Sequence, residues 1–85
     1  MNYHINISIT LENEKYINAG LSRKEMITEI EKIRGIGFCR EAYINSNIEV
    51  VFNGSLVQHT DDVEEMVEVI ENTLDLMLEE KGLTF

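Results

Sequence analysis

The sequence predicts a single small α+β domain over residues 1–85, built as a two-layer sandwich. Several stretches alternate apolar and polar residues, which is typical of half-buried strands, and two longer stretches repeat apolar residues at helical spacing. We expect an antiparallel sheet of three to five strands with two helices on one face, in the order β(β)αββ(β)α. The second helix is long and acidic. A chain of 85 residues can build one hydrophobic core of this kind.

The first strand is expected from Tyr3 to Leu11, where every second residue is apolar. Glu12 to Glu14 is typical of a turn. The segment Lys15–Asn18 is then a candidate for a short returning strand that ends before Gly20. The sequence leaves open whether this second strand forms.

The first helix is expected from Arg23 to Arg34. Ser22 and Glu25 have the spacing of a capping box, and an apolar stripe at helical spacing follows them. Gly35 is well placed as the left-handed residue that ends the helix.

Two further strands, Phe38–Ile44 and Ile48–Phe52, are expected to form a hairpin. The segment Asn45–Asn47 favours a tight turn between them. The dipeptide Asn53–Gly54 is typical of a type I′ turn and would return Leu56–Gln58 as a short edge strand. Together these segments predict an antiparallel meander.

The last helix is expected to begin at Thr60 or Asp61, with Asp61 and Glu64 as a second capping box, and to end at Gly82. Its apolar residues fall on one side, which should face the sheet. They are Val63, Met66, Val67, Ile70, Leu74, Met77 and Leu78. Leu83 is placed to pack back on Leu78 in a Schellman motif.

Charge is distributed very unevenly along the chain. Residues 1–42 hold six acids and six bases, whereas residues 43–85 hold ten acids and one base, so the second half carries the entire formal charge of −9. Nine of those ten acids lie in the last helix. At about 100° per residue, seven of them share one arc opposite the apolar side. We call these seven the acidic ridge: Asp61, Glu64, Glu65, Glu68, Glu71, Asp75 and Glu79.

The ridge has an energetic cost. Its like-charged pairs four residues apart cost about 1 to 2 kcal/mol together before screening. An outward helix face is usually charged, and net charge keeps small proteins dissolved. Mixed charges would serve solubility equally well, and the first helix has such a mixture. A surface of one sign suits a strongly basic partner, because it steers association and competes with phosphates for Lys and Arg.

Composition disfavours several other functions. A chain of charge −9 and pI near 4.5 is repelled by phosphate, so direct nucleic-acid binding is not expected. Neither a signal peptide nor a run of apolar residues long enough to span a membrane is visible, and the lone Cys39 fits a reducing compartment, so we expect a cytoplasmic protein.

Catalytic and metal-binding signals are weak. Cys39, His59 and Asp61 form a conceivable catalytic group, and His59, Asp61 and Asp62 a conceivable metal site, but neither has a known motif's spacing. We expect no enzyme activity, no metal and no cofactor.

Val69 and Leu76 lie on the shoulder of the last helix, outside its main apolar stripe. Two explanations stay open. The sheet curls around the helix and covers both side chains, or a second copy of the chain covers them in a homodimer.

Two functions follow. In length, charge and ridge, though not in any motif, the chain resembles the small acidic proteins that phages use as inhibitors, such as anti-CRISPR proteins, and the immunity proteins of nuclease toxins. That resemblance implies a nucleic-acid mimic that masks a basic nucleic-acid-binding surface of a partner protein. The expected partner-binding residues are Glu64, Glu65, Glu68, Glu71, Asp75 and Glu79. The alternative is a homodimeric structural or regulatory module assembled through the last helix, with acids that serve solubility only.

Overall fold

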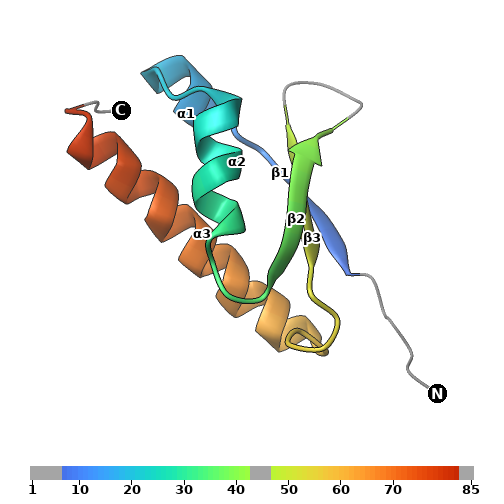
Figure 1. The fold of residues 1–85 in the computed structure, drawn as a ribbon. Helices are drawn as coiled ribbons and strands as arrows, with labels where there is room; N and C mark the ends of the chain where they lie inside the picture. The colour runs from blue at the N-terminus through green and yellow to red at the C-terminus, as the bar shows by residue number, and fades with distance from the viewer. Residues whose placement is uncertain (1–6, 43–46, 83–85) are drawn as a thin grey trace.

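The structure is a computed structural model that describes residues 7–42 and 47–82, and it has an α+β fold. The described residues form six elements, drawn in Figure 1. In chain order they are β1 (Ser8–Leu11), α1 (Glu14–Ala19), α2 (Arg23–Glu31), β2 (Ile36–Glu41), β3 (Ile48–Phe52) and α3 (Thr60–Glu80). The predicted α+β class and the antiparallel sheet are confirmed.

The sheet has the order β1-β3-β2, with β3 antiparallel to both neighbours. Alternate residues of β3, Ile48, Val50 and Phe52, are buried, because their side chains point toward the helices. In β2 the register shifts between Ile36 and Phe38, which leaves Gly37 as the extra residue of a bulge. The bulge lets Ile36 and Cys39 both pack against the core, although the two residues are three positions apart and would face opposite sides of a regular strand.

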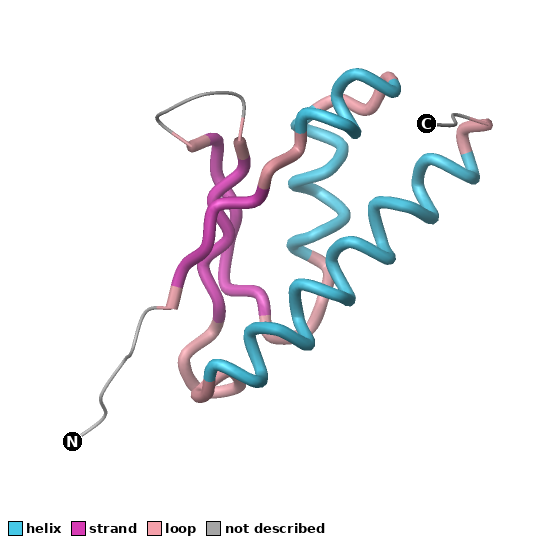
Figure 2. The backbone as a smooth tube through the Cα atoms, turned by 180° about the vertical axis from the view of Figure 1, so that it is seen from behind, coloured by secondary structure: helices cyan, strands magenta, loops and turns pink. Residues whose placement is uncertain are grey.

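All three helices lie on the same side of the sheet, as Figures 1 and 2 show from opposite directions. The core lies between the two layers and draws on β3, the loops and all three helices. The other sheet face carries a directly opposed pair, Arg40 and Glu49, joined by two hydrogen bonds of 2.8 and 3.1 Å. Phe38 lies on that face too and is 44% exposed.

The candidate strand Lys15–Asn18 is wrong, because this segment lies in helix α1. The helix ends in a complete Schellman motif. The N–H of Gly20, at φ +117°, donates to the carbonyl of Ile17, and the N–H of Leu21 donates to that of Tyr16. Tyr16 and Leu21 are both buried, as the hydrophobic contact of that motif requires.

Helix α2 begins where the capping box predicts. The side chain of Ser22 accepts a hydrogen bond of 3.2 Å from the backbone N–H of Glu25. The helix ends at Glu31, three residues earlier than expected, and a turn over residues 32–34 leads into Gly35 at φ +102°.

The predicted edge strand Leu56–Gln58 does not form. The side-chain oxygen of Asn53 accepts hydrogen bonds from the backbone N–H and the hydroxyl of Ser55. The backbone carbonyl of Asn53 accepts from the backbone N–H groups of Leu56 and Val57. These local bonds wind the chain into a turn in place of a strand. Val57 is thereby buried in the core.

Helix α3 begins at Thr60, but the predicted capping pair of Asp61 and Glu64 is wrong. The carboxylate of Asp62 accepts the N–H groups of Gln58 and His59, each at 3.2 Å. The capping box thus lies two positions earlier than predicted, with His59 and Asp62 in place of Asp61 and Glu64, and Asp61 is exposed. The remaining predicted features, namely the start of the first strand, most of the turn at 45–47 and the Leu83 contact, lie outside the described residues.

Candidate partner-binding surface

Helix α3 is fixed in the molecule by a narrow apolar stripe. Ile70, Leu74, Met77 and Leu78 are buried, and α1 and α2 both contact the helix. Because the stripe takes up one side of the helix, the opposite side is turned to solvent. This orientation follows from the spacing of the apolar residues.

The six predicted partner-binding residues are all exposed on α3, together with Asp61. At a rise of about 1.5 Å per residue, the seven carboxylates of the acidic ridge extend over about 27 Å. This gives about one negative charge per 4.5 Å of helix. One strand of B-DNA carries about one charge per 3.4 Å. The ridge therefore has a linear charge density similar to that of a nucleic-acid strand.

None of the seven ridge carboxylates forms a salt bridge with a basic side chain of residues 7–42 and 47–82. Several acids outside the ridge do form salt bridges. The four salt bridges there involve acids of α2, β2 and β3. They are Arg23–Glu41, Lys32–Glu29, Arg40–Glu49 and Lys81–Glu25. Four basic side chains of the described residues are thus paired with acids outside the ridge.

One ridge carboxylate, that of Asp75, accepts a hydrogen bond from a residue of the core. The hydroxyl of Tyr16, a residue 2% exposed, donates a hydrogen bond of 3.1 Å to Oδ1 of Asp75. Burial raises the pKa of the Tyr16 phenol well above its usual range, with further contributions from the hydrogen bond to Asp75 and the charges of Asp75 and Glu71. The phenol therefore stays a donor at neutral pH and holds Asp75 against α1.

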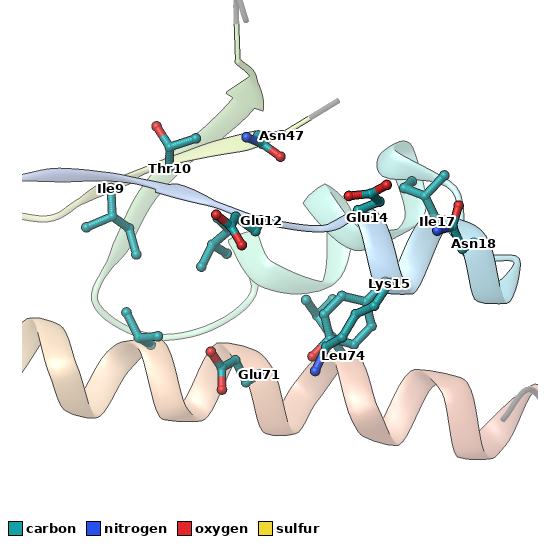
Figure 3. A pocket seen from close by; sticks show the side chains of 13 residues that line it. Ile9, Thr10, Glu12, Glu14, Lys15, Ile17, Asn18, Asn47, Glu71 and Leu74 are labelled. Carbon is teal, nitrogen blue, oxygen red and sulfur yellow. The ribbon is translucent and has the colours of Figure 1, made fainter. Parts of the chain in front are cut away.

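A groove of about 1070 Å³ lies between β1, α1 and α3, beside the ridge. Glu12 and Glu71 line it from opposite sides, and Leu74 contributes to its apolar surface (Figure 3). Lys15 lies over the Tyr16 ring, with its ammonium 4.8 Å from the ring centre. The sequence gives no sign of this groove, because it depends on how α1 crosses α3.

The residues considered for catalysis and metal binding are placed in different surroundings. Cys39 lies within β2 opposite Val50 and packs against the core, whereas His59 and Asp61 are exposed at the start of α3. Burial, assisted by the charge of Glu31, raises the pKa of the Cys39 thiol to about 12. A nucleophilic cysteine needs the opposite shift. Across the described residues, no group of three His, Cys, Asp or Glu side chains could hold a metal ion.

The shoulder residues Val69 and Leu76 are 42% and 56% exposed. The sheet therefore does not cover them, which rules out the first of the two explanations given above. They form an apolar strip, defined as these two residues, that runs along the ridge on the side away from the Tyr16 contact.

Comparison with known protein families, with curated proteins and with solved structures finds no significant match to this chain. None of the helices within the described ranges combines the length and the apolar character of a membrane span.

Proposed function

We propose that this chain is a non-enzymatic acidic binding protein that masks a basic nucleic-acid-binding surface of another protein. The observation that carries the proposal is the acidic ridge, a row of exposed carboxylates without salt bridges to the described basic residues. Glu64, Glu65, Glu68, Glu71, Asp75 and Glu79 would contact Lys and Arg side chains of the partner.

The physical basis is competition for the same cations. Phosphate contacts with Lys and Arg supply most of the affinity of non-specific nucleic-acid binding. A rigid helix with a similar charge spacing can occupy those cations, and its carboxylates form charge-assisted hydrogen bonds with guanidinium and ammonium groups. A folded helix loses little conformational entropy on binding, which favours it over a flexible acidic tail.

The test removes three negative charges from the ridge and compares this variant with a control of the same net charge. One variant carries Glu64→Gln, Glu68→Gln and Glu79→Gln, and its matched control carries Glu12→Gln, Glu14→Gln and Glu31→Gln, three exposed acids outside the ridge. Each protein is used to capture partners from a lysate at low salt, and the captured proteins are identified by mass spectrometry. We expect the wild type and the control to retain one basic nucleic-acid-binding protein that the ridge variant loses.

The captured protein is then tested for DNA or RNA binding by gel shift. The wild-type chain should prevent the shift, and the ridge variant should need at least tenfold more protein to do so. Equal capture and equal inhibition by all three proteins would refute the proposal.

A second function is favoured by the exposure of the apolar strip. Val69 and Leu76 would form the centre of a homodimer interface, with the acids serving solubility only. Sedimentation velocity at micromolar concentration distinguishes the two: a dimer supports this function, and a monomer removes it.

A further inference from the structure

The apolar strip has a regular position on α3. Val69 and Leu76 are seven residues apart, so their side chains lie on the same side of the helix about 10.5 Å apart. Thr73 lies between them, and its hydroxyl donates a hydrogen bond of 2.8 Å to the carbonyl of Val69. The exposed Asn72 is the other neutral polar residue in this interval, and the two acids of the interval, Glu71 and Asp75, lie on the ridge side of the helix. The strip therefore offers two apolar contacts separated by a neutral polar stretch.

Each end of the strip carries an acid. Glu65 precedes Val69 by four residues, and Glu80 follows Leu76 by four, so both lie near the line of the strip. Both are exposed, and neither takes part in a salt bridge within the part of the chain that the structure describes. Along α3 the order is acid, apolar, polar, apolar, acid.

We propose that the strip and its two flanking acids bind an amphipathic helix of the partner. Along one side of that helix the residues would be basic, apolar, polar, apolar and basic, in that order. This inference rests on the proposed function and specifies the kind of surface that the ridge recognises. The partner's cations would meet Glu65 and Glu80, and its apolar side chains would cover Val69 and Leu76.

The spacing selects a helix over a strand as the partner element. Residues seven apart on a helix repeat at about 10.5 Å on one side, which equals the spacing of Val69 and Leu76. A strand places residues of one face about 6.8 or 13.6 Å apart, and neither distance fits. A helix laid along α3 therefore brings two apolar side chains to the strip together.

Charge complementarity selects a basic partner over a second copy of this chain. In an antiparallel pair of α3 helices centred on the strip, Val69 would oppose Leu76 and Glu65 would oppose Glu80. The second copy would thus place acid against acid at both ends, with the two ridges on either side. A basic helix converts the same contacts into ion pairs.

The experiment uses two synthetic helical peptides as probes. The first is a Lys- and Arg-rich helix of about five turns with two leucines seven positions apart on one side, and the second has glutamine in place of both leucines. Dissociation constants are measured by fluorescence anisotropy at 50 and 150 mM NaCl. The proteins are the wild type, a strip variant (Val69→Gln with Leu76→Gln) and the ridge variant described above.

We expect the wild type to bind the leucine peptide at least tenfold more tightly than the glutamine peptide. The strip variant should lose that tenfold preference but bind the glutamine peptide as the wild type does. The ridge variant should bind both peptides more weakly. Circular dichroism and a urea midpoint near that of the wild type would show that the strip variant is folded.

The possible failures are distinguishable. Equal binding of both peptides by the wild type would overturn the inference and leave the charge-based function standing. Absence of binding to either peptide at 50 mM NaCl would overturn both. A wild type that sediments as a dimer, with a monomeric strip variant, would assign the strip to a second copy and also overturn the inference.

Discussion

At the scale of single residues, the contact between Tyr16 and Asp75 joins the hydrophobic core to the acidic ridge. Tyr16 contributes a buried ring, and its hydroxyl reaches the surface to donate to the carboxylate of Asp75. The contact orients one acid of the ridge and connects α1 to α3. Sequence reasoning missed it, because the two residues are 59 positions apart and Tyr16 was assigned to a candidate strand.

The variant Tyr16→Phe should lower the free energy of unfolding by about 0.5 to 1.5 kcal/mol at pH 7, because it removes the hydrogen bond and keeps the ring. The pKa of the phenol is raised in the folded state. Its contribution to stability is therefore complete below the unfolded pKa of about 10 and is lost as pH rises through the folded pKa. Urea unfolding at pH 7 and at pH 10 to 11 measures the difference between wild type and variant.

That difference should shrink at the higher pH. Asp75→Asn is the control, since its amide oxygen still accepts from the Tyr16 hydroxyl, and it should unfold near the wild-type midpoint. A Tyr16→Phe variant with the wild-type midpoint at pH 7 would show that the hydrogen bond is not formed in solution.

At the scale of elements, α2 and α3 differ in how their charged residues are arranged. At the C-terminal end of α2, the cap residue Lys32 pairs with Glu29 three residues earlier, at 3.0 Å. In α3, Glu64/Glu68 and Glu71/Asp75 are like-charged pairs four residues apart. These like-charged pairs lower the stability of α3, and such a cost is consistent with the binding surface proposed above.

Salt should reveal this repulsion. The melting temperature of the wild type should rise as NaCl is increased from about 0.02 to 0.5 M, because the Debye length falls from above 10 Å to a few ångströms.

Glu68→Lys replaces the repulsion with Glu64 by an attraction. The variant should therefore be more stable than the wild type by about 0.5 to 1 kcal/mol at low salt, and its melting temperature should depend less on salt. Thermal melts followed by circular dichroism measure both effects. A wild-type melting temperature that is flat or falls with salt would contradict the account of the ridge as strained by its own charge.

The elements also show where sequence reasoning succeeds. The α+β class, β3 and the start of α2 follow from period and capping, which are local properties. Helix α1 was missed because six residues are too few to display a helical period. Gly20 followed by the apolar Leu21 was the available signal, since that pair is typical of a Schellman motif.

At the scale of the whole molecule, the exposed side of α3 was predictable, and the groove beside it was not. The exposure of the ridge depends only on the spacing of apolar residues along one helix. The groove and the Tyr16 contact depend on the angle at which α1 meets α3, which no local pattern specifies. The orientation of Phe38 toward the open face likewise depends on the bulge at Gly37.

Gly35 lies where the helical layer and the sheet come into contact. It links α2 to β2, its carbonyl accepts the N–H of Asn53 at 2.8 Å, and its backbone lies against α3. A Cβ at this position would lie 3.3 Å from Cε of Met66 and 3.5 Å from Cγ2 of Val57. The positive φ therefore favours glycine at this position, and a Cβ would also crowd the end of the flexible Met66 side chain.

Gly35→Ala should consequently be more destabilising than the same change at Gly82, which also has a positive φ, +70°, but meets nothing within 4 Å. Gly82→Ala should cost about 1 to 2 kcal/mol from backbone strain alone. Gly35→Ala adds crowding against Cε of Met66, for a total of roughly 2 to 3 kcal/mol. Urea midpoints of the two variants measure the gap. If the costs were equal, or Gly82→Ala were the larger, then the Met66 side chain of α3 would not be packed closely against the α2–β2 junction in solution.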